Sequence, residues 1–329
     1  MQGVWRMCSR RSALPGAVPR PRARLSSGAA ESRPILERGI PVPARKIIFL
    51  DVDGTIMTYD GAIPASAKRA IAAARAAGHT VFLCTGRSKA EIPSELAALG
   101  FDGMIGANGA YVEYHGEVVA HQTIAPDQCR RLVDWLHQHG LEFYLESNNG
   151  LFASEHFREV ALPVLLASMG EVPAHQVEDI DVEDILHGMV FGASLYRDDV
   201  NKVSYILSSY QDYQNACEAF PDFACSTWGG KGEQPLFGDI GIKGIDKAYA
   251  VRLVVDHMGA DQVNTIAMGD AKADIPMFEA CATSVCMGSG GDEAKAAADY
   301  VSTDVDADGL WNAFLHLGLI SDAEVAVTL

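Results

Sequence analysis

The sequence predicts an α/β protein with a doubly wound, mostly parallel sheet and a smaller α+β module inserted into it. From Lys46 onward, short apolar runs alternate with amphipathic windows of helix length. The first run, 46–52, is apolar almost throughout, as expected for a strand that is covered on both faces. This alternation of strand and helix patterns stops near residue 110 and resumes at 246, so we expect the sheet to be built from two separate segments of the chain.

The first segment predicts two strand–helix units, a third strand and a hairpin. After strand 46–52, residues 64–77 form a helix that ends before a glycine. The alternating run 110–119 predicts a hairpin that turns at His115-Gly116. The remaining elements of this segment are strand 80–87, helix 88–99 and strand 103–110.

The inserted module begins with a helix at 125–140, whose apolar stripe holds Cys129, Leu132, Val133 and Leu136. "LEFYLES", "GLFAS" and "GMVFGASLY" predict strands, and "DDVNKVSYILSSY" predicts a helix. The stretch 226–235 has three Gly and one Pro in ten residues, which favours a return linker. We therefore expect the core at 46–118 and 236–322, and the inserted module at 119–235.

The second core segment returns to the strand–helix pattern. Asp246 is a candidate N-cap for a helix at 247–258. Strands are expected at 263–270, 283–288 and 298–303, with a final helix at 308–317. The two segments together predict a Rossmann-like core.

Charge and composition exclude several classes of protein. Net charge is −17; residues 1–45 hold nine Arg and two Glu, or +7, which leaves −24 for the rest. The strongly negative charge of residues 46–329 argues against nucleic-acid binding. No apolar run approaches the ~18 residues of a membrane span. Residues 1–45 predict a disordered extension of a cytoplasmic protein, and their Arg-rich, acid-poor composition leaves organellar import as an alternative.

Polar residues follow the predicted parallel strands at the edge where ligands bind in such sheets. Asp51 and Asp53 point the same way because they are two apart in an extended chain. Several carboxylates at one edge would repel each other unless a cation lies among them, and oxygen ligands suit Mg²⁺. The residues at these strand ends are Asp51, Asp53, Thr55, Thr85, Gly86, Arg87, Asn108, Asp270 and Asp274.

Taken together, these motifs resemble those of the haloacid dehalogenase (HAD) superfamily, and more narrowly its Cof-type (subfamily IIB) phosphatases. "DVDGT" at 51–55 resembles the first motif of the superfamily. "TGR" at 85–87, "ANGA" at 107–110, Lys247 and "GDAKAD" at 269–274 resemble the others, in the same order. In that group an α+β cap is inserted after the third strand, where this chain has its inserted module.

The resemblance implies a Mg²⁺-dependent phosphatase that acts on a small phosphorylated metabolite, a sugar phosphate or a cofactor phosphate. Asp51 would be the nucleophile that forms an aspartyl-phosphate, and Asp53 the general acid and base. Mg²⁺ would be bound by Asp51, Asp270, Asp274 and the backbone carbonyl of Asp53. Phosphate and substrate would be bound by Thr85, Gly86, Asn108 and Lys247.

Two features leave alternatives open. Lys243 and Lys247 both precede the same helix, although the distance of Lys247 from Asp270 resembles the family spacing better. Ala273 stands where Cof-type proteins usually have Asn, which suggests weakened or retuned activity. Ala273 alone suggests the first alternative, a non-hydrolysing phosphometabolite-binding or regulatory protein. The second alternative is a phosphomutase of the same superfamily, which the placement of the cap disfavours. We expect a monomer or a weak homodimer with no nucleic-acid or membrane partner.

Overall fold

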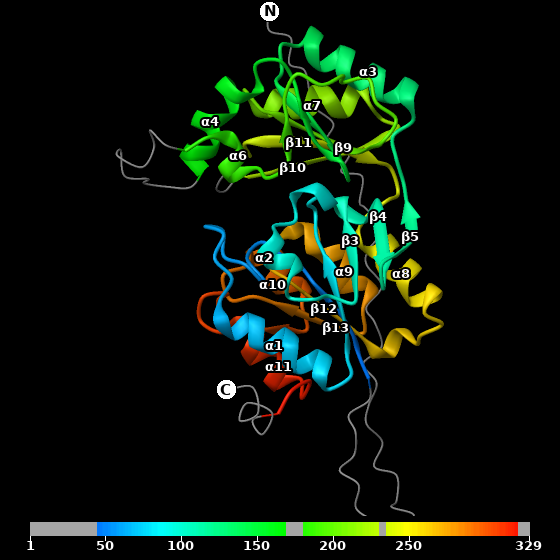
Figure 1. The fold of residues 1–329 in the computed structure, drawn as a ribbon, viewed down its shortest axis with the longest axis vertical. Coiled ribbons are helices and arrows are strands. Elements are labelled where there is room, and N and C mark those ends of the chain that lie inside the picture. Colours follow the sequence, from blue (N-terminus) through cyan, green and yellow to red (C-terminus); the bar gives the residue numbers. More distant parts are fainter. Residues whose placement is uncertain (1–44, 169–179, 230–234, 322–329) are drawn as a thin grey trace, which may run out of the picture. The chain divides into compact units, whose positions relative to one another are not determined.

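A computed structural model describes residues 45–168, 180–229 and 235–321, and these residues form two β-sheets with helices around each (Figure 1). The larger sheet has eight strands and the smaller has six. The extension predicted at 1–45 lies outside the described residues except for Arg45.

The eight-stranded sheet is parallel from β14 to β3 and ends in an antiparallel hairpin of β4 and β5. The hairpin turns at His115 and Gly116, both with positive φ, which confirms the predicted turn. In spatial order the strands are β14 (Tyr300–Val301), β13 (Thr283–Cys286), β12 (Thr265–Gly269), β1 (Ile47–Leu50), β2 (Thr80–Cys84), β3 (Gly103–Gly106), β4 (Tyr111–Tyr114) and β5 (Glu117–His121).

The apolar run of β1 is explained by the two cores on either side of this sheet. Ile48 and Leu50 pack into one core, while Ile47 and Phe49 pack into the other. Helices α1 (Ala65–Ala76) and α11 (Gly309–His316) lie side by side over the first core (Figure 1). The second core is covered by α8 (Lys247–His257) and α9 (Ile275–Ala280). The predicted α/β core is confirmed.

The prediction of one continuous helix at 88–99 is wrong. The chain forms a 3₁₀ turn, η1 (Lys89–Glu91), and the single-turn α2 (Ser94–Ala97) instead. Pro93 separates them, and Ile92 before it is extended, with ψ 111°. Proline has no N–H to donate and disfavours the helical conformation of the residue before it, so the helix is interrupted.

The six-stranded sheet, which we call the cap sheet, is antiparallel except between β7 and β8. One of its faces packs against α3 (Pro126–Gln138) and α7 (Tyr210–Ala219). The other packs in part against α4 (Phe157–Ser168) and α6 (Val182–Ile185). In spatial order the strands are β10 (Phe223–Trp228), β11 (Phe237–Ile242), β9 (Val200–Ile206), β6 (Phe143–Ser147), β7 (Gly150–Ala153) and β8 (Met189–Val190).

Two expectations for this part of the chain are corrected by the cap sheet. "DDVNKVSYILSSY" contains β9, whose seven residues are all buried, and not a helix. Residues 226–228 belong to β10 and not to a linker, and β10 pairs with β11. Since Phe237–Ile242 pairs within the cap sheet, we propose that the chain returns to the core at 243–246 and not at 236.

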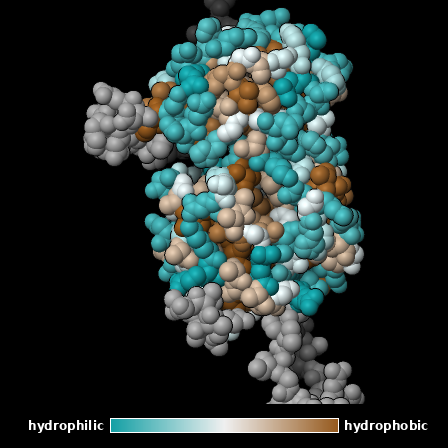
Figure 2. All heavy atoms as spheres, in the orientation of Figure 1, coloured by the Kyte–Doolittle hydropathy of each residue, from teal (hydrophilic) through white to brown (hydrophobic). Residues whose placement is uncertain are grey.

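Polar residues cover most of the face drawn in Figure 2, and apolar residues show between them in smaller groups. The described part of the chain has no helix that is long and apolar enough to cross a membrane.

Candidate active site

Three buried carboxylates meet at the carboxyl ends of neighbouring strands of the core sheet. β1 lies between β12 and β2, with Leu50 opposite Met268. Asp51 therefore leaves the sheet beside Asp270, and Asp274 follows in the turn η4 (Lys272–Asp274). One oxygen from each of these three carboxylates lies within 4.8 Å of the others. The predicted convergence of these residues is thus present in the fold.

Lys247 is buried at the first position of α8 and joins two of these carboxylates. Its Nζ donates to Asp51 Oδ1 at 2.7 Å and to Asp274 Oδ1 at 2.6 Å. Asp246 caps the helix by accepting from the backbone N of Tyr249, as predicted, and this fixes where α8 begins. Lys243 donates instead to the backbone carbonyl of Pro221. Of the two candidate lysines, only Lys247 contacts the carboxylates.

Glycine is required where the chain approaches these carboxylates most closely. Gly54 has φ +77°, and a Cβ on it would lie 2.3 Å from Asp270 Oδ2. A Cβ on Gly269 would lie 2.4 Å from Asp274 Cγ. The second oxygen of Asp274 accepts from the backbone N of Asp270 and Ala271, which holds this loop in shape. The turn after Asp51 therefore needs glycine to let the two loops approach each other.

The electrostatics of this cluster favour a cation. Burial, then Asp274, raises the pKa of Asp51 well above its usual value, although Lys247 opposes the shift. Burial likewise raises the pKa of Asp270 to about 6. Burial lowers the pKa of Lys247, but Asp274 and Asp51 outweigh it and the net shift is upward. Asp270 Oδ1 is also buried without a hydrogen-bond partner. Three carboxylates, of which only two are paired with an ammonium, fit a divalent cation such as Mg²⁺.

Asp53 lies outside this cluster of three and pairs with Arg87. Arg87 Nε donates to Asp53 Oδ2 at 2.9 Å, and Nη2 donates to Oδ1 at 2.7 Å. Such a two-pronged contact fixes the plane of the carboxylate as well as its position. Sequence reasoning placed Arg87 in a motif but did not give it this partner, which is 34 residues away along the chain.

Tyr59 is a site residue that the sequence did not indicate. Its hydroxyl donates to Asp270 Oδ2 at 2.5 Å, although the residue as a whole is 71% exposed. It lies in the loop after "DVDGT", where no spacing distinguishes it from a surface tyrosine. Tyr59 thus orients one of the three carboxylates from the solvent side.

Thr85, Gly86 and Asn108 come together after β2 and β3, as predicted. Asn108 N donates to Thr85 O at 3.1 Å, and a Cβ on Gly86 would lie 3.1 Å from Asn108 Oδ1. Asn108 and Ala107 both have positive φ, at 53° and 48°. Such backbone strain clusters at functional sites, and here it holds the Asn108 side chain at a pocket.

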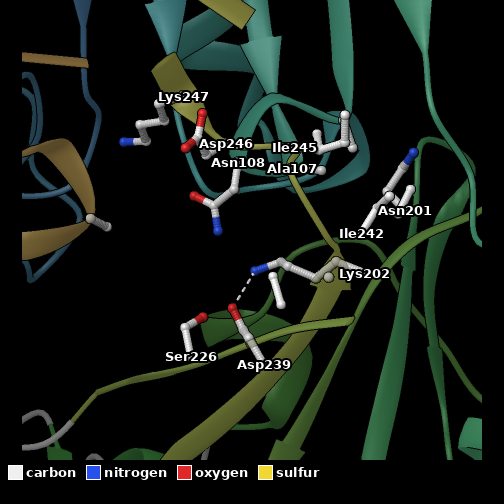
Figure 3. A pocket seen from close by; sticks show the side chains of 14 residues that line it. Ala107, Asn108, Asn201, Lys202, Ser226, Asp239, Ile242, Ile245, Asp246 and Lys247 are labelled. Atoms are coloured by element: carbon white, nitrogen blue, oxygen red, sulfur yellow. Dashed lines mark hydrogen bonds and ion pairs between the residues drawn. The ribbon is translucent and has the colours of Figure 1, made fainter. Parts of the chain in front are cut away.

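That pocket, of about 220 Å³, is lined by residues of the cap sheet and by residues of core loops and helix ends (Figure 3). Asn108, Lys247 and Ala273 come from the core. Residues of the cap sheet also line it, and sequence reasoning missed them: β9 was predicted as a helix, and 226–235 as a linker to the core. They include Asn201, Lys202, Ser226 and Asp239.

The family described as haloacid dehalogenase-like hydrolase matches residues 48–314. The chain belongs to this family. The resemblance seen in its motifs is confirmed, and so is the expected enzyme class of hydrolase. YkrA of Bacillus subtilis, which is named as a phosphatase, is 28% identical over 277 residues, or 84% of this chain and 98% of YkrA. The pyridoxal phosphate phosphatase YbhA of Escherichia coli is 26% identical, over 80% of this chain and 96% of its own.

Solved structures give the same assignment for this HAD-like hydrolase. A sugar phosphatase of HAD subclass IIB is 27% identical with a TM-score of 0.67, and the match covers 84% of this chain and all of that one. A HAD phosphatase from Bacteroides thetaiotaomicron is 25% identical with a TM-score of 0.67, over 88% of this chain and all of that one. The Cof-type, subclass IIB resemblance is therefore confirmed together with the fold.

Proposed function

We propose that this HAD-like hydrolase is a Mg²⁺-dependent phosphatase that transfers the phosphoryl group of a small phosphate ester to Asp51. The observation that carries this proposal is the buried cluster of Asp51, Asp270 and Asp274, of which Asp51 and Asp274 pair with Lys247. Its excess negative charge and raised carboxyl pKa values make the cluster unfavourable unless a cation compensates it.

Asp51, Asp270 and Asp274, with the backbone carbonyl of Asp53, would hold Mg²⁺. The bound ion would supply positive charge beside the phosphoryl oxygens. Phosphoryl transfer depends mainly on positioning the reacting groups and on stabilising the charge of the phosphoryl oxygens. The remaining site residues contribute to these two tasks.

In the first step, a carboxylate oxygen of Asp51 attacks phosphorus and the bond from phosphorus to the ester oxygen breaks. Asp53 gives its proton to the departing alcohol. Lys247, Thr85 and Asn108 donate hydrogen bonds to the phosphoryl oxygens. The product of this step is an aspartyl-phosphate at position 51.

In the second step, a water molecule attacks phosphorus and the bond to the Asp51 oxygen breaks. Asp53 accepts the proton of the water, which restores the carboxyl group needed for the next turnover. Inorganic phosphate leaves and Asp51 is regenerated. Arg87 keeps the Asp53 carboxylate in one orientation through both proton transfers.

The relatives support a small phosphorylated metabolite as substrate. They include a pyridoxal phosphate phosphatase and a 5-amino-6-(5-phospho-D-ribitylamino)uracil phosphatase. The non-hydrolysing alternative depended on Ala273 alone, and the complete carboxylate–lysine cluster favours hydrolysis over it. Cytoplasmic location and the monomeric or weakly dimeric state remain predictions.

The test is phosphate release from phenyl phosphate and from a panel of phosphorylated metabolites, with Mg²⁺ and with EDTA. We expect release that requires Mg²⁺. A folded protein that binds Mg²⁺ and releases no phosphate from any ester would overturn the proposal and favour the binding protein.

A further inference from the structure

Tyr59 lies in a tight turn of the core whose backbone is fixed by its neighbours. Just before the turn, Ile56 and Met57 are buried in the core on one side of the sheet. Within the turn, Thr58 N donates to Ala62 O at 2.9 Å, and Ala62 N donates to Thr58 Oγ1 at 3.0 Å. These contacts hold the backbone of Tyr59 in place without any help from its ring.

The side chain of Tyr59 extends from this turn to a carboxylate of the proposed cation site. Tyr59 is 71% exposed and Asp270 is 3% exposed, yet the Tyr59 hydroxyl donates to Asp270 Oδ2 at 2.5 Å. An exposed ring gains little free energy from burial. The specific contribution of this side chain is therefore the hydrogen bond that its hydroxyl makes, and not the packing of its ring.

The two side-chain oxygens of Asp270 are in different environments. Oδ2 accepts the hydrogen bond of Tyr59, whereas Oδ1 is buried and has no hydrogen-bond partner among the described residues. A buried acceptor without a partner is unfavourable, so a cation at Oδ1 would compensate it. One oxygen of Asp270 also lies within 4.8 Å of oxygens of Asp51 and Asp274. Asp270 therefore offers one open oxygen to a cation.

The number of open carboxylate oxygens matters because divalent cations differ in the ligands that they prefer. Mg²⁺ is small, keeps several waters and is bound through few carboxylate oxygens. Ca²⁺ takes about six to eight oxygen ligands and often binds both oxygens of one carboxylate. A cation bound through both oxygens of Asp270 would compete with the Tyr59 hydroxyl for Oδ2. The hydrogen bond of Tyr59 thus favours binding through one oxygen, which suits Mg²⁺ better than Ca²⁺.

We propose that Tyr59 is a positioning residue that holds Asp270 with one oxygen open to the cation, and that it thereby selects Mg²⁺ over Ca²⁺. This inference rests on the proposed function, because it takes the carboxylate cluster as a cation site. Hydrogen-bond partners of metal-binding carboxylates commonly change metal affinity by about 10- to 100-fold when they are removed. Tyr59 acts through Asp270 and has no direct part in phosphoryl transfer.

The test is isothermal titration calorimetry of the full chain, freed of metal with EDTA and dialysed, with Mg²⁺ and with Ca²⁺ in separate titrations. In Tyr59→Phe the Kd for Mg²⁺ should rise about tenfold or more, and the Kd for Ca²⁺ should rise less. The ratio of the Ca²⁺ Kd to the Mg²⁺ Kd should therefore fall. Tyr196→Phe is the matched control, because the Tyr196 hydroxyl donates to exposed Asp134 in the cap at 2.7 Å, and it should keep both native Kd values.

A spectrum tests the contact itself. Mg²⁺ at Asp270 should perturb the hydrogen bond of Tyr59, so the native chain and Tyr196→Phe should give a tyrosine difference spectrum in the near ultraviolet on Mg²⁺ addition, and Tyr59→Phe should not. A folded Tyr59→Phe variant that keeps this signal, keeps both native Kd values, or loses affinity for the two ions equally would overturn the inference and leave the proposed function intact. A native chain that binds neither ion would overturn both.

Discussion

Asp270→Asn should stabilise the protein when metal is removed, although it removes a residue assigned to the active site. Asn has nearly the same shape as Asp, and its side-chain oxygen can still accept from the Tyr59 hydroxyl. What changes is the charge of a carboxylate that lies close to Asp51 and Asp274. Without a cation, that charge opposes folding.

The size of the effect follows from the pKa of Asp270. Burial raises this pKa from 3.8 to about 6, so the folded chain binds the proton more tightly than the unfolded chain. Stability is therefore lost as pH rises from about 4 to about 6, and the loss is complete above the folded-state pKa. A shift of this size corresponds to about 3 kcal/mol at pH 8. The variant avoids this loss, which for a chain of this size means a Tm several degrees higher.

The assay is thermal unfolding in EDTA at pH 4.5 and pH 8, repeated at pH 8 with Mg²⁺. In EDTA the variant should melt above the native chain at pH 8 and close to it at pH 4.5. Mg²⁺ should stabilise the native chain much more than the variant. Asp306→Asn, at an exposed site, is the matched control. A variant that is no more stable than the native chain at pH 8 in EDTA would refute the electrostatic reasoning.

Three further changes test the contacts around the site. Lys247→Met leaves Asp51 and Asp274 without their shared partner and should lower the free energy of unfolding in EDTA by about 3 kcal/mol. The control, Lys243→Met at an exposed site, should change this free energy by less than about 0.5 kcal/mol. Equal effects of the two variants would contradict the assignment of Lys247 as the lysine that pairs with the carboxylates. Arg87→Lys keeps the positive charge but loses the two-pronged contact with Asp53, so kcat should fall about tenfold. An unchanged kcat and an unchanged pH profile would show that Arg87 does not orient Asp53. Ala273→Asn adds an amide at the pocket lining and should raise kcat/KM for phosphate esters several-fold; a lower value would show that this pocket is adapted to the smaller residue.

The sequence predicted the core and most of the catalytic cluster because local signals and sheet topology agree there. The apolar residues of β1 are explained by the two cores that they enter. In the turn after β1, Gly54 is needed because a Cβ at this position would collide with Asp270. Because β1 is a parallel neighbour of both β12 and β2, the residues that follow these three strands must lie close together. Asp51, Thr85 and Asp270 could therefore be placed from the order of the strands alone.

The contacts that were missed depend on tertiary packing. Val200–Ile206 was assigned to a helix, although Lys202 and Ser204 alternate with Val203 and Tyr205 as a strand requires. That error concealed the polar face of the cap sheet. The pairs of Arg87 with Asp53 and of Tyr59 with Asp270 join residues far apart in sequence, and no periodicity encodes them. The glycines at 229–232 were interpreted as part of a return linker to the core, whereas the strands on either side of them, β10 and β11, pair with each other in the cap sheet.

The central claim is that the phosphoryl group passes through Asp51, and chemical trapping tests it most directly. Borohydride reduces an acyl phosphate to an alcohol, so an aspartyl-phosphate becomes homoserine. The native chain, quenched during turnover with Mg²⁺ and substrate and then reduced, should carry homoserine at position 51 in peptide mass spectra, and Asp51→Asn should neither trap nor release phosphate. Phosphate release by Asp51→Asn at the native rate, or trapping at another residue, would contradict the mechanism.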